Sequence, residues 1–187
     1  MWNLDLLQLA GITWLIWALY WMIAARFVNA ARSSEGVLLR ATHLVPLYAG
    51  FILIFTGHPI IHGKLYHSQL IRIAGFALVL AGLLFAVWAR IHLGKNWSGI
   101  ITLKVDHELI RTGPYHLVRH PIYSGMFTAV VGTAIIAGTV DAFVGAVLIL
   151  IAFLIKMRRE ESFLMREFGE TYVRYKAQVS ALVPYVF

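Results

Sequence analysis

Five apolar runs, each long enough or nearly long enough to cross a bilayer, constrain the fold of this 187-residue chain more than any other feature. An α-helix rises about 1.5 Å per residue, so about twenty apolar residues match a hydrocarbon core about 30 Å thick. We predict spans at approximately residues 5–27, 38–57, 71–92, 121–138 and 140–157. The predicted fold class is all-α: an integral membrane bundle of five transmembrane helices in one domain, residues 1–187.

Composition and the ends of the runs support a membrane domain. The chain is 60% hydrophobic and only 13% charged, which excludes an ordinary soluble globule. It has no cysteine, so disulfides, thiolate catalysis and cysteine-ligated zinc are excluded. The N-terminus lacks the basic region of a cleavable signal, and we expect the first run to be retained as a span. Only Gly138 and Thr139 separate the last two runs, which predicts a tight antiparallel helical hairpin.

The basic residues predict the orientation. With five spans, only Lys64 and Arg72 fall on one side, which leaves fourteen of the sixteen Lys and Arg residues on the other. The positive-inside rule then places the N-terminus outside and the C-terminus in the cytosol. Orientation explains the net charge of +7, so a nucleic-acid partner is not expected. Residues 93–120 and 156–187 are predicted to meet on the cytosolic face.

Small residues predict close helix packing in the second half of the bundle. Gly125, Ala129, Thr133 and Ala137 recur every four residues, and this spacing gives one smooth helix face. Gly75 and Gly82 give the third run a similar face. We expect these faces to be structural.

The stretch from Gly113 to Gly125 concentrates polar groups in an apolar chain. It holds one arginine, two histidines and two tyrosines within thirteen residues. Pro121 suits the first position of the following helix, which places His120 at a helix N-terminus beside free amide groups. Such an end favours anionic ligand groups, a carboxylate or a phosphate. The alternative is an interfacial loop whose basic residues meet lipid phosphates.

The segment after the fifth run is the second polar region. It begins at Lys156 as a charged continuation of the helix, with apolar residues spaced as on an amphipathic helix. Lys156 and Glu160 lie one turn apart, so they are predicted to pair as i and i+4 neighbours. The alternative is a surface helix lying at the membrane interface.

Together the two regions resemble the isoprenylcysteine carboxyl methyltransferase family and its phospholipid methyltransferase relatives. The resemblance covers roughly Leu93 to Pro184. The matching residues are His107, Leu109, Gly113, Tyr115, Arg119, His120, Pro121, Tyr123, Gly125, Glu160, Glu161, Phe168, Gly169, Tyr172 and Tyr175.

The resemblance implies a membrane methyltransferase whose cofactor, S-adenosylmethionine, is held by the cytosolic loop and tail. The chain has no glycine-rich dinucleotide-binding motif following a strand, in agreement with that expectation. The implied cofactor-binding residues are Lys104, His107, Leu109, Tyr115, Arg119, His120, Pro121, Tyr123 and Glu161. The implied catalytic residues are Glu160, Arg159 and Lys156, and no metal is expected.

The identity of the acceptor depends on a position at which this chain departs from the family pattern. The family's carboxylate-holding arginine lies one turn before the first glutamate, where this chain has Lys156. Lysine lacks the bidentate fork of arginine, and either Lys156 or the nearby Arg159 could replace it. We expect a lipophilic or prenylated acceptor that enters from the bilayer among the membrane lipids. The main prediction is therefore methylation of a prenylcysteine-like carboxylate.

Two alternatives to this acceptor remain. The first is a phospholipid amine methyltransferase acting on a lipid of the phosphatidylethanolamine type. The second is a small transporter or channel. The spans carry almost no charge at mid-membrane depth, which argues against an ion pathway. The sequence leaves the natural acceptor and the oligomeric state open.

Four further histidines carry no assigned role. His58, His62 and His67 have spacings that a metal could use, but no carboxylate or cysteine accompanies them, which favours an ordinary polar loop. His43 lies near the cytosolic end of the second run, where it faces the site or caps a neighbouring group.

Overall fold

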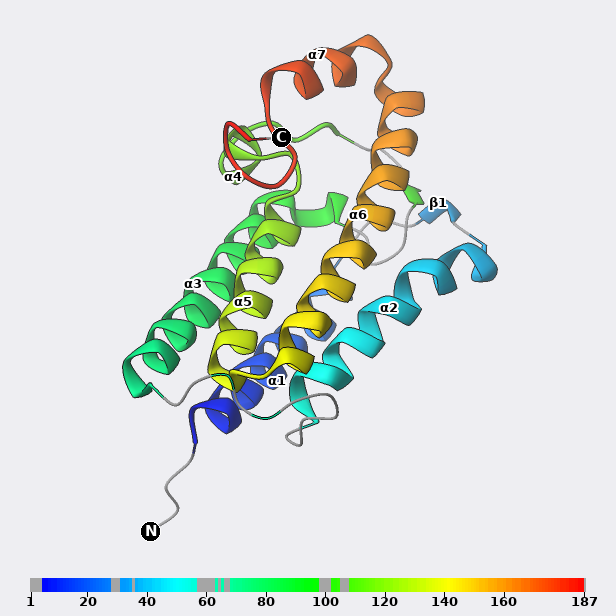
Figure 1. The fold of residues 1–187 in the computed structure, drawn as a ribbon. Helices are drawn as coiled ribbons and strands as arrows, with labels where there is room; N and C mark the ends of the chain where they lie inside the picture. Colours follow the sequence, from blue (N-terminus) through cyan, green and yellow to red (C-terminus); the bar gives the residue numbers. More distant parts are fainter. Residues whose placement is uncertain are drawn as a thin grey trace.

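Five long helices form the body of the molecule (Figure 1). The computed structural model describes residues 5–27, 31–34, 36–56, 63, 65, 68–97, 102–104 and 108–186. The long helices are α1 (Leu6–Ala24), α2 (Val37–Phe55), α3 (Gln69–Leu93), α5 (Pro121–Ala137) and α6 (Val140–Phe168). The shorter elements are β1 (Ala31–Ser34), η1 (Gly94–Asn96), β2 (Thr102–Lys104), α4 (Pro114–Leu117) and α7 (Glu170–Gln178).

Four of the described helices, α1, α2, α3 and α6, are long and apolar enough to cross a membrane. Helix α5 is apolar but has only 17 residues. The prediction of five spans is thus supported for four helices, and a crossing by α5 stays a prediction. The last part of α6, from Lys156 onward, is charged and projects beyond the ends of α2 and α5 (Figure 1).

The predicted hairpin between the last two runs is confirmed. Helix α5 ends at Ala137, and Gly138 adopts the left-handed conformation with φ +64° that reverses the chain. Thr139 then caps α6, its side chain accepting a hydrogen bond from the amide of Ala142. The two helices are consequently antiparallel neighbours.

Glycine contacts hold the helices in two tight pairs. A Cβ atom added at Gly125 of α5 would lie 2.5 Å from the carbonyl oxygen of Gly82 of α3. In the same way, a Cβ at Gly145 of α6 would lie 2.5 Å from the carbonyl oxygen of Gly50 of α2. Backbone therefore packs on backbone in both the α3–α5 and the α2–α6 pair. The predicted packing role of Gly82 and Gly125 is confirmed.

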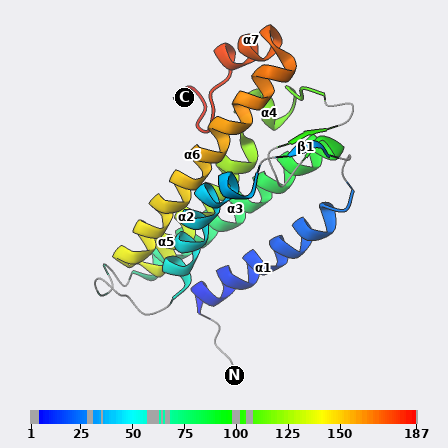
Figure 2. The same ribbon diagram turned by 90° about the vertical axis from the view of Figure 1, so that its right-hand side faces the viewer.

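Hydrogen bonds anchor helix α1 near its middle and at both ends. The indole Nε1 of Trp14 donates to Thr133 Oγ1 of α5 at 3.0 Å. At the N-terminal end of α1 Arg72 Nη2 donates to Asp5 Oδ1 at 2.6 Å, and at its C-terminal end Arg90 Nη2 donates to Ala24 O at 2.7 Å. Between these points α1 lies against α3 and α5, and it touches α2 through side chains, with the Trp14 and Phe51 rings edge-on at 5.3 Å (Figure 2).

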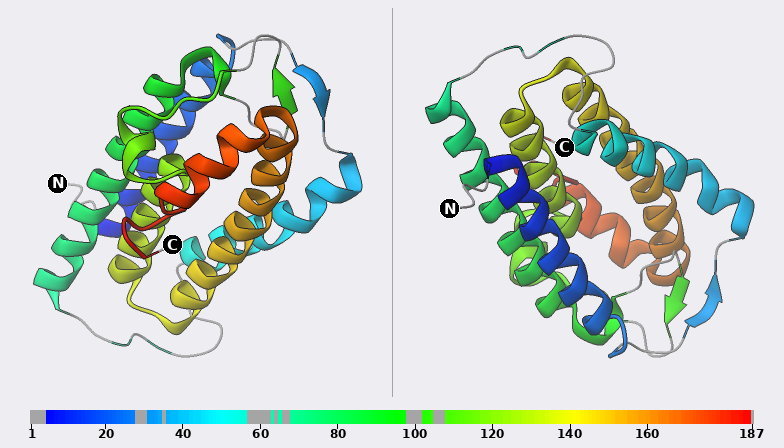
Figure 3. Two further views of the ribbon diagram at one scale, coloured as in Figure 1. Left: turned by 90° about the horizontal axis from the view of Figure 1, so that it is seen from above. Right: turned by 90° about the horizontal axis from the view of Figure 1, so that it is seen from below.

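A short antiparallel ribbon joins two segments far apart in the sequence. Strand β1 pairs with β2, with Ser34 opposite Thr102. Neither strand was expected, because residues 93–120 were predicted only as a cytosolic segment. Helix α7 and the C-terminal segment lie across the same end of the helix bundle (Figure 3).

Candidate functional site

One large cavity joins the polar end of the molecule to the apolar helices. Its volume is about 910 Å3, and residues of α1, α2, α4, α5, α6, α7 and the 108–110 segment line it. Its polar end lies under α4 and α7, where the two motif regions meet. Its apolar end lies between α1 and α2.

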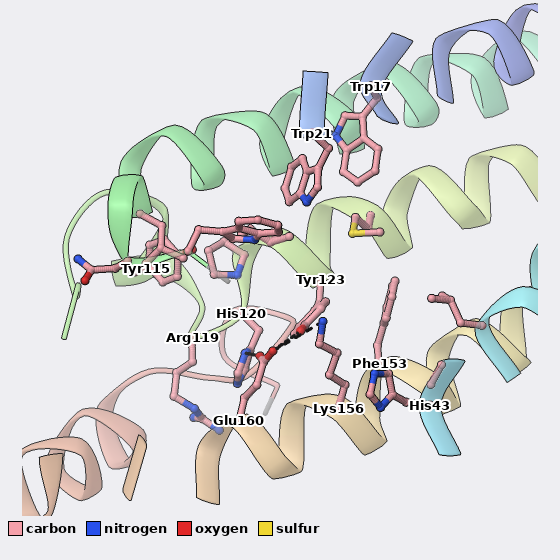
Figure 4. A pocket seen from close by; sticks show the side chains of 18 of the residues that line it. Trp17, Trp21, His43, Tyr115, Arg119, His120, Tyr123, Phe153, Lys156 and Glu160 are labelled. Atoms are coloured by element: carbon pink, nitrogen blue, oxygen red, sulfur yellow. Dashed lines mark hydrogen bonds and ion pairs between the residues drawn. The ribbon is translucent and has the colours of Figure 1, made fainter. Parts of the chain in front are cut away.

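His120, Tyr123 and Glu160 form the centre of the polar end (Figure 4). His120 precedes α5 and its Nδ1 lies 3.8 Å from Glu160 Oε2 of α6. The Tyr123 hydroxyl donates to Glu160 Oε1 at 2.6 Å. The predicted convergence of the turn before α5 with the acidic residues of α6 is therefore confirmed. All three side chains line the cavity.

Glu161 has different surroundings from Glu160. It accepts hydrogen bonds from Arg119 Nε at 2.9 Å and from Lys176 Nζ at 2.6 Å, and His120 Nε2 lies 3.2 Å from it. Burial raises the pKa of this carboxyl, but the three cationic or hydrogen-bonding neighbours outweigh burial and lower the pKa to about 2. Glu161 does not line the cavity. The structure thus gives the two adjacent glutamates different environments.

The two backbone amides just before α5 have partners in the C-terminal segment. The amide of Arg119 donates to Ser180 O at 2.8 Å, and that of His120 donates to Ala181 O at 3.0 Å. The C-terminal segment thus folds back over this turn and occupies these two amides. The free amides expected in the first turn of α5, next to His120, stay a prediction. Arg119 supports the same contact, since its Nη1 donates to the carbonyls of Lys176 and Val179. This turn is therefore a docking point for the tail.

Lys156 and Arg159 point to different places. Lys156 lines the cavity, with its Nζ 4.0 Å from Glu160 Oε1 and 5.8 Å from the centre of the Tyr123 ring. This contact confirms the predicted i, i+4 pair. Arg159 instead donates from Nη1 to the carbonyl of Leu39 in α2 and does not line the cavity. Of these two side chains, Lys156 is thus the one that lines the cavity.

The remaining predicted cofactor residues are placed unequally. Leu109, Tyr115 and Pro121 line the cavity. Burial raises the pKa of Tyr115 well above its usual value, so the phenol stays protonated. Lys104 lies in β2, where the structure describes the backbone only, and His107 lies outside the described residues.

Three of the histidines without an assigned role also fall on residues that the structure does not describe. His58, His62 and His67 are outside the described residues. Within the described part of the chain, no group of three or more metal-ligating side chains occurs. His43 is described: it is 5% exposed and lines the cavity, which answers the question the sequence left open.

Tryptophans of α1 form a wall that the sequence did not assign to the site. Trp17 and Trp21 both line the cavity, and their rings stack with centroids 4.4 Å apart. Trp21 in turn meets Trp97 edge-on at 5.6 Å. The spacing of four residues between Trp17 and Trp21 was the available signal, since it places both rings on one helix face.

The apolar end of the cavity reaches the surface of the helix bundle. Leu15 of α1 and Tyr48 of α2 line the cavity, yet they are 71% and 62% exposed. Residues that both line a cavity and face outward mark its opening. The opening is therefore on the side of the bundle between α1 and α2, at the depth of the apolar helices.

Comparisons with known proteins agree with this arrangement. A family model described as phospholipid methyltransferase matches residues 70–171. Protein-S-isoprenylcysteine O-methyltransferase B of Arabidopsis thaliana is 30% identical over 115 residues, which are 60% of this chain and 58% of that protein. Protein-S-isoprenylcysteine O-methyltransferase of Saccharomyces cerevisiae is 30% identical over 122 residues, which are 64% of this chain and 51% of that protein.

A solved structure shares the fold. It is that of a eukaryotic intramembrane Ras methyltransferase, isoprenylcysteine carboxyl methyltransferase, with a TM-score of 0.56 and 23% identity. The match covers 80% of this chain and 52% of that chain, and this chain spans about half the length of these relatives. The family match includes His120, Glu160 and most of the cavity's polar end, and it covers more than half of the chain. This chain is a multi-pass integral membrane protein and belongs to the phospholipid methyltransferase family.

Proposed function

We propose that this protein is a membrane-embedded, S-adenosylmethionine-dependent methyltransferase that methylates the carboxylate of a lipophilic, prenylcysteine-like acceptor. The observation that carries the proposal is the single cavity in which the polar His120–Glu160 end is continuous with an apolar end between α1 and α2. Such a cavity suits a reaction between a water-soluble nucleoside and a lipid. The names of the relatives support the same reaction.

The polar end fits the proposed cofactor. The Glu160 carboxylate accepts from the Tyr123 hydroxyl in the structure and has further acceptor capacity for ribose hydroxyls or an ammonium group. The buried hydroxyl of Tyr172, in the cavity wall, has no hydrogen-bond partner among the described residues, and burial raises its pKa, so it remains a donor. A volume of about 910 Å3 is in the usual range for small-molecule sites, roughly 300–1,000 Å3.

Aromatic side chains complete the cofactor site. Bound S-adenosylmethionine supplies an electrophilic methyl group on a cationic sulfur. Tyr115, Tyr123 and Trp97 line the cavity, and aromatic faces stabilise a cation without acting as competing nucleophiles. We include Lys104 and His107 in the proposed site on the resemblance alone.

The chain's own contribution to methyl transfer is alignment. A carboxylate acceptor is already ionised at neutral pH and needs no base, only a cation that positions it. Lys156 is the proposed cation, since it lies at the junction of the polar and apolar ends beside Glu160. The apolar helices α1 and α2 would hold the lipid and exclude water from the reacting groups.

The proposed orientation places this chemistry in the cytosol. The polar end of the cavity lies at the end of the bundle that holds α7 and the C-terminal segment. That end carries most of the Lys and Arg residues, so the positive-inside rule makes it cytosolic and the N-terminus external.

A phospholipid amine methyltransferase is the second candidate. Two observations favour it: the description of the matching family and the lysine at position 156. Lysine cannot form the bidentate contact by which arginine holds a carboxylate. An amine acceptor must also lose a proton before transfer, so this reaction would need a base.

A parallel transfer assay tests the proposal. Purified protein in lipid nanodiscs is given radiolabelled S-adenosylmethionine with either a farnesylcysteine analogue or phosphatidylethanolamine. We expect label in the farnesylcysteine methyl ester. Label in the phospholipid alone would instead establish the second candidate, and label in neither would refute both.

The variant Glu160→Gln tests the site within the same assay. Hydrogen bonds to a charged group contribute about 1.5–3 kcal/mol, so we expect cofactor affinity to fall about 10- to 100-fold. Glu167→Gln is the control, because Glu167 is an exposed residue of the same helix. Unchanged cofactor affinity and unchanged transfer in Glu160→Gln would contradict the assigned role.

A further inference from the structure

A second nitrogen-bearing side chain shares the junction of the cavity with Lys156. His43 of α2 is 5% exposed and lines the cavity, and it is unusual in being polar on that face of α2. The cavity-lining residues Leu47, Phe51 and Phe55 follow it at steps of four residues, about 6 Å each. These four residues span about 18 Å of α2, and His43 lies at the end of this row nearest the polar end of the cavity.

The register of α2 against α6 places His43 opposite Lys156. Gly50 packs on Gly145, and further along Arg159 donates to Leu39 O, so the two helices are antiparallel neighbours. Between these two contacts, the regular rise of both helices brings His43 opposite the turn of α6 that holds Phe153 and Lys156. Figure 4 agrees, since His43 lies beside Phe153 on the Lys156 side of Glu160.

The other cationic groups of the cavity lie in closer carboxylate and carbonyl contacts than Lys156, whose Nζ is 4.0 Å from Glu160 Oε1. Arg119 bonds Glu161 and two backbone carbonyls of the C-terminal region. His120 lies between Glu160 and Glu161, at 3.8 and 3.2 Å. An anion placed beside His120 would be repelled by the Glu160 carboxylate. An anion placed at the junction meets the ring of His43 and Lys156, on the side of Lys156 away from its Glu160 partner.

We propose that His43 and Lys156 together form the binding site for the anionic headgroup of a lipid acceptor. The inference rests on the proposed function and adds to it the headgroup chemistry and a residue on α2. A lipid whose tail lies along Leu47, Phe51 and Phe55 has its headgroup at His43. An imidazole carries at least one N–H donor in either protonation state, and Lys156 carries three. The two helices thus bind the headgroup from opposite sides, which replaces the two-pronged contact of a single arginine.

Paired lipid probes measure this preference without turnover. One pair is a farnesylcysteine analogue with a free carboxylate and the same compound as a carboxamide. The other pair is farnesyl phosphate and farnesol, which distinguishes a phosphate headgroup from a carboxylate. Binding of each compound to the full chain in nanodiscs is measured. For each pair, the affinity for the charged compound divided by the affinity for the neutral compound gives the affinity ratio. For wild type we expect a ratio of about 10 or more in at least one pair.

Variants of His43 decide the inference. His43→Phe keeps the ring volume and removes the donor, so the ratio should fall at least threefold. His43→Gln keeps a donor and should retain part of the ratio, and it carries the test if the phenylalanine variant is unstable. Thr42→Val is the matched control, because Thr42 lies on the same turn, does not line the cavity and bonds the carbonyl of Leu39 in its own helix. It should leave the ratio unchanged.

The outcomes separate this inference from the proposed function. A full wild-type ratio in both His43→Phe and His43→Gln would overturn the inference, as would a wild-type ratio near one in both pairs. S-adenosylmethionine affinity is measured on the same samples and should change less than twofold in the His43 variants. Failure of wild type to bind S-adenosylmethionine would refute the proposed function, whatever the lipid ratios show.

Discussion

Glu160 and Glu161 are adjacent in α6 but make different contacts. Glu160 faces the cavity and bonds Tyr123, whereas Glu161 faces away and bonds Arg119 and Lys176. Successive residues of a helix point about 100° apart, so neighbours in the sequence meet different surroundings. We interpret Glu161 as the group that fixes α7 and the turn before α5 on α6. Its predicted contact with the cofactor stays a proposal, and the geometry favours Glu160 for that contact.

The pKa of Glu161 gives a prediction at this scale. Its usual value is 4.5 and the folded value is lowered to about 2, so its charge stabilises the fold fully above about pH 4.5. This stabilisation is lost as the pH falls from about 4.5 to about 2. At pH 7, Glu161→Gln should therefore lower the free energy of unfolding by a few kcal/mol. The variant should accordingly unfold at a lower temperature than wild type.

Thermal unfolding of the detergent-solubilised protein at a series of pH values checks this expectation. The gap between wild type and Glu161→Gln should narrow below about pH 4.5. Glu167→Gln, on the exposed face of α6, should follow wild type throughout. A gap that stays constant down to pH 3 would exclude a titrating Glu161 as the cause.

At the scale of helices, the bundle depends on backbone contact within two pairs. In the α3–α5 pair, Gly82 and Gly125 each face the backbone of the other helix. Helix α1 has no such contact with α2 among the described residues and presents tryptophans to the cavity instead. Tight pairs and a loosely held α1 explain how a bundle of this size keeps an open cavity on one side.

Gly82→Ala tests the tight pair. The added Cβ would lie 2.6 Å from the backbone nitrogen of Ala129, so α3 and α5 must move apart. We expect a loss of about 1–3 kcal/mol or more in stability, measured as a lower unfolding temperature in detergent. Gly11→Ala is the control, because its Cβ would meet only Phe55 at 3.8 Å, an ordinary contact. It should be neutral or slightly stabilising, since alanine favours helix. Equal effects of the two variants would argue against backbone contact as the cause.

Across the whole molecule, the C-terminal segment completes the polar end of the cavity. Ser180, Ala181 and Leu182 accept hydrogen bonds from Arg119, His120 and Ser124 at the start of α5. The tail therefore fixes the turn that carries His120 without lining the membrane part of the cavity. Contacts between residues about 60 positions apart thus connect the two ends of the family motif.

Deletion of residues 179–187 tests that connection. We expect S-adenosylmethionine affinity to fall at least tenfold, because the His120 turn loses its backbone partners, while the helix content measured by circular dichroism stays nearly constant. Deletion of residues 184–187 leaves those hydrogen bonds in place and is the matched control. Equal cofactor affinity in both truncated proteins would show that the tail does not position His120.

Sequence by itself determined the elements of this protein and much of its site. Apolar run lengths located the long helices, the two-residue link located the α5–α6 hairpin, and the number of runs together with the family resemblance placed His120 and Glu160 at one end. Each of these signals is local: it depends on the helical repeat, on chain length or on a short motif. The same local rule gave the Lys156–Glu160 pair one turn apart.

Only the tertiary structure decided which polar groups face the cavity. It paired β1 with β2, gave the amides of Arg119 and His120 to the tail, and turned Arg159 toward α2. It also brought His43 and the tryptophans of α1 into the cavity wall. Helical periodicity fixes which residues share a face, but the rotation of one helix against another depends on glycine contacts and hydrogen bonds between distant segments. Those contacts form only when the whole chain packs, and no single stretch of the sequence contains them.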